Sequence, residues 1–171
     1  MGTFLCDPQL NEAIPQLNSS KLRQQRIDFI LKLNPWTHFV TLTYIQSRGH
    51  FTVGKIEVLR RSRLFLSILN QKIYGRHGCR RSGFRIGSCA VLGWGTYGYH
   101  PHTHWLLAKP SHLTNEEFNC HIELIASTTL GIGKERDIQT IFSNHVVEYI
   151  VNHGFEGWIE QVTFAAKCPV R

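Results

Sequence analysis

Hydrophobic residues recur along the chain with two different periods, and these periods predict the order of its helices and strands. Apolar residues three or four positions apart, as in a helix, mark residues 21–33, 55–74, 114–130 and 144–153. Alternation of apolar with polar or β-branched residues, as in a strand, marks residues 38–45, 84–92, 99–108 and 134–142. This order predicts an α+β fold: a central, mostly antiparallel sheet of about five strands with flanking helices.

The length of 171 residues suits one domain with its own hydrophobic core. We expect an N-terminal helical segment over residues 1–35 and a main domain over residues 36–171, forming a single domain overall. No apolar run approaches the ~20 residues that a membrane span needs, and the first residues lack the pattern of an export signal. The five cysteines are scattered without a Cys-x-x-Cys pair, which is typical of reduced thiols. We therefore expect a cytoplasmic protein with no membrane partner.

Positive charge is concentrated in the middle of the chain. The formal net charge is +7, and no acidic residue occurs between Glu57 and Glu116. Repulsion among so many cations costs stability unless an anionic partner relieves it, and a nucleic acid is the obvious polyanion. A solvated surface is the alternative. The cations in this interval are Arg60, Arg61, Arg63, Lys72, Arg76, Arg80, Arg81, Arg85 and Lys109.

Two histidines in the stretch YHPHTHWLLAKP, residues 99–110, are candidate metal ligands. On a strand, residues two apart share a face, so His102 and His104 project side by side. The apolar residues that follow, from Trp105 to Ala108, predict a strand whose far end is buried, and buried imidazoles need partners. Imidazole pairs suit zinc, manganese, iron, nickel or copper. The alternative is a pair of surface histidines on a polar strand face.

The last predicted helix carries a tyrosine between two histidines. In SNHVVEYIVNHG, residues 143–154, helical spacing places His145, Tyr149, Asn152 and His153 along one side. Phenol is a poor nucleophile at neutral pH unless a cation or a base assists it, and these neighbours make Tyr149 a candidate catalytic residue. The alternative is an amphipathic helix with a half-buried tyrosine.

Three segments together resemble the motifs of the HUH endonucleases, above all the single-tyrosine rolling-circle replication initiators, which are related to relaxases and single-strand transposases. FVTLTY, residues 39–44, resembles the initiators' first motif, F-x-T-L-T. PHTHWLL, residues 101–107, resembles the metal motif, in which a hydrophobic residue separates two histidines. YIVN, residues 149–152, lies where the third motif, Tyr-x-x-Lys, is expected. The resemblance covers residues 36–158 with the motifs in the expected order.

Three positions depart from the family pattern. Thr103 replaces the hydrophobic residue between the histidines, with a methyl group that can still face the core, and Asn152 stands in place of the motif lysine. Many relatives carry a metal-binding glutamate where this chain has Gly93. Some of the transposases supply a third ligand from the tyrosine helix, so we expect His153 to take that role. Reduced or lost activity is the alternative.

The resemblance implies an HUH- or RRM-like palm and an enzyme that nicks and rejoins single-stranded DNA at a specific sequence. Tyr149 would attack the phosphate with help from Asn152, leaving a 5′-phosphotyrosine and a free 3′-OH. His102, His104 and His153 would bind manganese or magnesium, with zinc as an alternative.

The biological role implied is initiation of rolling-circle replication of a plasmid, phage or mobile element in a bacterial or archaeal host cell. The expected partners are single-stranded DNA or an origin hairpin, and a host helicase. The expected DNA-binding residues are Arg60, Arg61, Arg63, Arg76, Arg80, Arg81, Arg85 and Lys109.

The residues also allow three other functions. A nucleic-acid-binding domain without catalysis would explain why the glutamate and the lysine are missing. A single-strand DNA transposase would use the same chemistry, from a dimer that exchanges tyrosine helices. A small zinc hydrolase would use His102 and His104 and would make no use of Tyr149.

Overall fold

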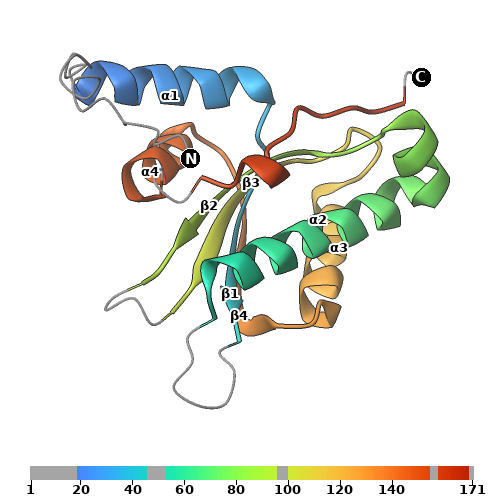
Figure 1. Ribbon diagram of the computed structural model, residues 1–171. Helices are drawn as coiled ribbons and strands as arrows, with labels where there is room; N and C mark the ends of the chain where they lie inside the picture. Colours follow the sequence, from blue (N-terminus) through green and yellow to red (C-terminus); the bar gives the residue numbers. More distant parts are fainter. Residues whose placement is uncertain (1–18, 46–52, 96–99, 155–157, 170–171) are drawn as a thin grey trace, which may run out of the picture.

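The computed structural model of the protein contains one open antiparallel sheet with helices on both faces (Figure 1). The structure describes residues 19–45, 53–95, 100–154 and 158–169. The strands lie in the order β2-β3-β1-β4, so the predicted α+β class is confirmed, with four strands where about five were expected. The elements are α1 (Ser19–Leu33), β1 (His38–Tyr44), α2 (Lys55–His77), the π-helix η2 (Gly78–Ser82), β2 (Gly87–Gly93), β3 (His102–Ala108), α3 (Asn115–Thr128), β4 (Ile132–Thr140), α4 (His145–Gly154) and the short 3-10 helix η5 (Glu160–Val162).

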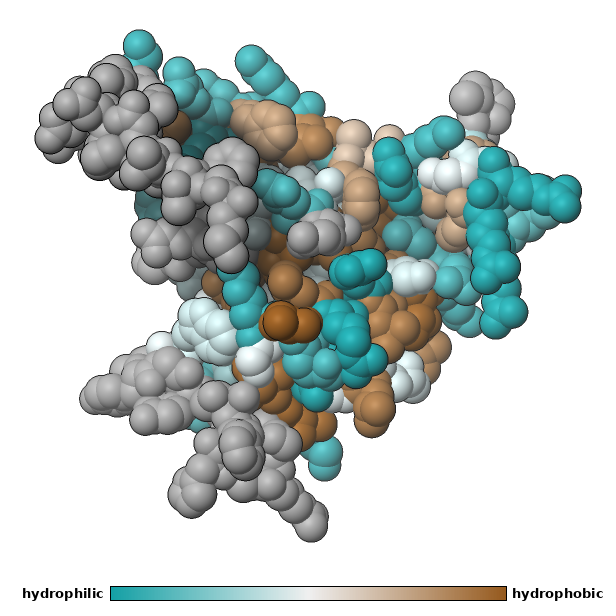
Figure 2. Space-filling model, viewed as in Figure 1, coloured by the Kyte–Doolittle hydropathy of each residue, from teal (hydrophilic) through white to brown (hydrophobic). Residues whose placement is uncertain are grey.

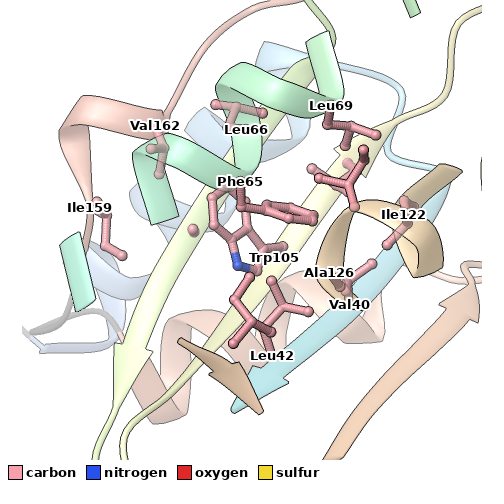
Figure 3. Packing of buried hydrophobic residues seen from close by; sticks show 14 of the residues in the cluster. Val40, Leu42, Phe65, Leu66, Leu69, Trp105, Ile122, Ala126, Ile159 and Val162 are labelled. Atoms are coloured by element: carbon pink, nitrogen blue, oxygen red, sulfur yellow. The ribbon is translucent and has the colours of Figure 1, made fainter. Parts of the chain in front are cut away.

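Helices α2 and α3 cover one face of the sheet, which we call the α2/α3 face (Figure 1). Trp105 of β3 lies at its centre, with the ring of Phe65 from α2 at a centroid distance of 5.3 Å (Figure 3). Both side chains are fully buried, as is Ile122 of α3. Because burial of one large apolar side chain contributes about 1.5–3 kcal/mol, this cluster fixes both helices on the sheet.

Helices α1 and α4 pack against the opposite face, which we call the α1/α4 face (Figure 1). Ile30 of α1 and Ile150 of α4 are fully buried there, together with Leu106 of β3. The first and the last α-helix, α1 and α4, thus contribute to one hydrophobic core on this side of the sheet. None of the helices in the described ranges is long and apolar enough to cross a membrane.

The predicted helices and strands lie within a few residues of the observed ones, with one clear difference at the end of α2. The segment GRHGCRRSG, residues 75–83, was predicted as a loop, but α2 continues to His77 and η2 follows it. Gly75 kinks the helix at a φ of 70°, and Gly83 ends η2 at a φ of 65°. A residue without Cβ adopts these angles at little cost, so Gly75 allows α2 to bend and continue, and Gly83 allows η2 to end.

The two edges of the sheet are treated differently. The C-terminal segment runs along the outer edge of β2, where Trp158 pairs with Val91 and Phe164 pairs with Ser88. This segment takes the place of a fifth strand without forming a regular one. At the other edge, β4 carries the charged run Lys134–Asp137, and charged edge strands discourage pairing with other chains.

His38 is a fully buried histidine at the start of β1. The ring of Phe118 from α3 lies edge-on to its imidazole at a centroid distance of 4.9 Å. Burial, and secondly the positive charge of Lys109, lowers the pKa of His38 from 6.5 to about 4. The imidazole is therefore neutral in the folded protein at neutral pH.

Lowering the pH from 7 to 4 should destabilise the protein through His38. In the unfolded chain this imidazole binds a proton below pH 6.5, whereas in the folded protein it stays neutral until about pH 4, so stability is lost between these values. At about 1.4 kcal/mol per pKa unit, the loss reaches roughly 3 kcal/mol. The free energy of unfolding, measured by urea denaturation, should therefore fall less between pH 7 and pH 4.5 in His38→Gln than in the wild type. An equal change in both proteins would contradict the assignment, and the exposed His112→Gln is the control.

Candidate functional site

Three rings from β3 and α4 meet on the α1/α4 face. The ring centroids of His102 and His104 lie 4.8 Å apart, and the ring of Tyr149 lies 5.5 Å from that of His104 at an angle of 81°. The Tyr149 side chain is 42% exposed, and both imidazoles are partly exposed. The family resemblance implies that these three residues act at one site, and the structure brings their rings together on one face.

The strand between the two histidines is anchored from the other side of the sheet. Thr103 is fully buried on the α2/α3 face, where its Oγ1 accepts a hydrogen bond of 2.8 Å from Nε1 of Trp105. The same oxygen lies 2.8 Å from the Tyr44 hydroxyl, which lies 2.8 Å from Oγ of Ser62. Buried polar groups are costly unless they are paired, so this network fixes β3 at that point. The hydroxyl of Thr103, and not only its methyl group, explains why threonine suits this position.

Two residues of β1 hold the ring of His104. Phe39 stacks on it with ring centroids 5.4 Å apart at 15°, and its ring also contacts Tyr149 edge-on at 5.9 Å. Thr41 pairs directly with His104 across the two strands, and its Oγ1 lies 3.0 Å from Nδ1 of the imidazole. A hydrogen bond to one ring nitrogen determines which nitrogen is left to act as a ligand. Thr41 therefore orients the His104 ring through Nδ1, and either atom of this contact can be the donor.

The ring of His102 is held by the backbone and lies over a glycine. Its Nδ1 is 2.9 Å from the carbonyl oxygen of His100, and because that oxygen only accepts hydrogen bonds, Nδ1 carries the proton. Gly93 of β2 pairs with His102, and a Cβ on Gly93 would lie 2.5 Å from Nε2 of the ring. Gly93 is thus covered by an imidazole, and a larger side chain at this position would require the ring of His102 to move.

No third metal ligand joins the two histidines among the described residues. Within those ranges, no three histidine, cysteine, aspartate or glutamate residues lie close enough together to hold a metal ion. The backbone of His153 belongs to α4, but its side chain lies outside the described part of the structure. Asp137 pairs with Thr41 on β4, two strand spacings or roughly 10 Å from the backbone of His104, and it forms no group of three possible ligands with the two histidines. Asn152 is exposed on α4, one turn after Tyr149.

The predicted DNA-binding arginines at the start of α2 lie on the helix that covers the opposite face. Both Arg60 and Arg61 bind Glu57, at 2.8 and 2.7 Å, and their hydrogen bonds lower the pKa of that carboxyl to about 2. Arg61 also donates to the carbonyl oxygens of Ile45 and Gly131, so it ties α2 to the ends of β1 and β4. Arg63 is exposed on the same helix.

The remaining predicted cations lie further along the chain. Hydrophilic residues gather over the C-terminal end of α2 in Figure 2. Nζ of Lys109 donates to the carbonyl oxygen of Leu113, on the side of α3. The structure therefore does not bring these cations to the three rings, and their contact with DNA stays a prediction. The exposed arginines at this end are Arg76, Arg80, Arg81 and Arg85.

Comparison with known proteins adds no relative. No family model, curated protein or solved structure matches the chain. The contacts of the three rings and the distribution of charge are therefore the observations that bear on function.

Sequence reasoning did not find the residues that position the two imidazoles. Phe39 and Thr41 lie in the strand that resembles the initiators' first motif, and their alternation with buried Val40 indicated that they share a face. Pairing with His104 depends on the register between β1 and β3, which no local pattern gives. From the sequence, Gly93 was noted as the position that lacks the expected glutamate ligand. In the structure, the ring of His102 lies where a side chain at Gly93 would be.

Gly93→Ala should displace the ring of His102. The new Cβ would lie within 2.5 Å of Nε2, so the ring must turn and lose its hydrogen bond to the carbonyl of His100. We expect the ring nitrogens of His102 to shift in a proton–nitrogen NMR spectrum of the histidine side chains. Gly54→Ala, where an added Cβ has no atom within 4 Å, is the matched control. An unmoved His102 signal in Gly93→Ala would contradict this packing.

Proposed function

We propose that the protein is an HUH-type endonuclease that cleaves and rejoins single-stranded DNA through a covalent bond to Tyr149. The observation that carries the proposal is the 5.5 Å between the rings of Tyr149 and His104, on a face where His102 is the next neighbour. A candidate nucleophile and two candidate metal ligands occur together there on a partly exposed surface. The four-stranded antiparallel sheet, with the histidines on one of its inner strands, is compatible with the palm of that family.

The two imidazoles suit a divalent cation. In the neutral imidazole of His102, the hydrogen bond from Nδ1 to a backbone carbonyl leaves the lone pair on Nε2. The hydroxyl of Thr41 is the hydrogen-bond partner of Nδ1 of His104. Such outer hydrogen bonds are usual for metal-binding histidines. His102 and His104 would hold manganese or magnesium, or zinc as an alternative, with His153 as the proposed third ligand. When bound, the cation would offset negative charge on the non-bridging oxygens of the DNA phosphate.

The chain's own residues would carry the transfer. Tyr149 would form the bond from its phenolic oxygen to phosphorus while the bond from phosphorus to the 3′-oxygen breaks. The phenolic proton would pass to a neighbouring base or to water, and the leaving oxygen would take up a proton to become the 3′-OH. Asn152, one turn along α4, would position the phenol. Attack by a 3′-OH on the same phosphotyrosine reverses the step, so strands rejoin without a further energy source.

Several observations support single-stranded DNA as the partner. The net charge is +7, and four exposed arginines lie at the end of α2 and in the residues that follow it. One of the four, Arg85, also donates to the carbonyl oxygen of Ala165 and lies over the ring of Phe164. Exposed cations are the ones that can bind phosphates. The proposed biological role is initiation of rolling-circle replication of a plasmid, phage or mobile element, at a single strand or an origin hairpin and with a host helicase.

One observation favours a second candidate, a nucleic-acid-binding domain without catalysis. No third candidate ligand joins His102 and His104 among the described residues, and the ring of His102 lies over Gly93, the position where HUH endonucleases often carry glutamate. A covalent-adduct experiment separates the two candidates.

Replacing Tyr149 by phenylalanine should abolish covalent capture of DNA and leave binding intact. The ring contacts to His104 and Phe39 are kept, and only the nucleophilic oxygen is lost. The measurement is a denaturing gel of the protein with Mn²⁺ and a pool of fluorescent single-stranded oligonucleotides. Tyr74→Phe, on the far part of α2, is the control and should capture DNA like the wild type. If the wild type forms no adduct with any oligonucleotide but still binds DNA, the second candidate is supported.

Thr41→Val should weaken metal binding, because it removes the hydroxyl 3.0 Å from Nδ1 of His104 while keeping the shape of the side chain. Loss of such a partner typically costs about 10- to 100-fold in metal affinity. Thr41→Ser keeps the hydroxyl and should stay close to the wild type. The dissociation constant for Mn²⁺, measured from the signal of free Mn²⁺ in electron paramagnetic resonance, tests this. Equal affinities for the valine and serine variants would show that Thr41 does not orient the ligand.

A further inference from the structure

A cavity of about 780 Å³ lies between α1, the start of α2 and the C-terminal segment. These elements surround it from three sides, with α1 above and α2 below in Figure 1. The volume is within the range of ligand-binding pockets. None of the residues of the proposed catalytic site lines it.

Two aromatic rings form one wall of this cavity. The rings of Phe29 from α1 and Trp158 from the C-terminal segment have centroids 6.3 Å apart and are tilted by 46°. Phe29 is 55% exposed, although the same helix buries Ile30 completely. An aromatic side chain that faces a cavity in this way offers a flat surface for stacking.

Polar side chains of several kinds surround the two rings. Arg26 from α1 and Lys55 from α2 bring two positive charges, and Glu160 from η5 brings one negative charge. The amide of Gln25 and the carboxylate of Glu160 supply hydrogen-bond donors and acceptors. A flat apolar surface, hydrogen-bonding groups and an excess of positive charge match the three parts of a nucleotide, which are the ring face, the ring edge and the phosphate.

The cavity and the three rings of the candidate site lie near neighbouring strand positions in the sheet. Trp158 pairs with Val91, which in turn pairs with His104. Two strand spacings, roughly 10 Å, therefore separate the backbones of Trp158 and His104. A stacked strand of DNA advances about 3.4 Å per nucleotide, so a few nucleotides span such a distance.

We propose that this cavity binds a nucleobase of the single strand, stacked on Phe29 and Trp158, a few nucleotides from the phosphate that Tyr149 attacks. The inference rests on the proposed function for the identity of the ligand. It adds a base-binding subsite built from α1 and the C-terminal segment, which would select where along a strand the enzyme cleaves. Arg26 and Lys55 bind the phosphate next to that base.

The test measures binding without cleavage, in EDTA, by fluorescence anisotropy of a labelled oligo-dT. An oligonucleotide of the same length made of abasic residues keeps the phosphates and lacks the bases. Phe29→Ala should weaken binding of oligo-dT by about 5- to 150-fold, the equivalent of 1–3 kcal/mol of stacking per base, and should leave binding of the abasic strand unchanged. Phe29→Leu keeps the apolar packing on α1, loses the flat ring and should behave in the same way.

Phe142→Ala removes another exposed phenylalanine, which is 94% exposed and does not line the cavity, and it serves as the matched control. If oligo-dT binds equally to the Phe29 and Phe142 variants, the subsite is wrong and the proposed nuclease activity is unaffected. If the wild type forms no covalent adduct but oligo-dT binding depends on Phe29, the nuclease proposal fails and the subsite stands. If the wild type does not bind oligo-dT at all, both proposals fail.

Discussion

The antiparallel register between β1 and β3 is the constraint on which the site depends. It places Thr41 opposite His104 on one face and Leu42 opposite Thr103 on the other. Because side chains alternate along a strand, a slip of one residue would turn both histidines into the α2/α3 core and bring Trp105 out of it. Burial of Trp105 therefore keeps the imidazoles on the face that α4 shares, so the stability of the fold and the geometry of the site have one cause.

The site and the core also share individual residues. Thr103 completes a buried hydrogen-bond network with Tyr44 and Trp105, and it is the residue that separates the two histidines. Phe39 contributes to the core under α1 and α4 and contacts the rings of His104 and Tyr149. The core therefore fixes the backbone of β3 between the histidines and one face of the His104 ring.

The positively charged residues predicted to bind DNA do not lie around the histidine pair. The predicted phosphate-binding arginines lie on α2 and after it, on the far side of the sheet from the histidine pair or at its end. Arg61 serves mainly to hold the protein together, since it binds Glu57 and two backbone carbonyls. Two further cations, Arg26 of α1 and Lys55 at the start of α2, line the cavity beside Trp158. DNA that contacts both regions would have to pass around an edge of the sheet.

The amino-acid sequence alone determined the α+β class, the order of the elements and the shared face of His102 and His104, because these follow from residue periodicity. It also indicated the tyrosine helix. Only the tertiary structure decided that Tyr149 packs beside His104, that Thr41 and Phe39 hold that ring, and that Gly93 makes space for His102. These contacts join segments far apart in the chain, and they depend on strand register and helix packing, which are set by the burial of the whole core and not by any local pattern.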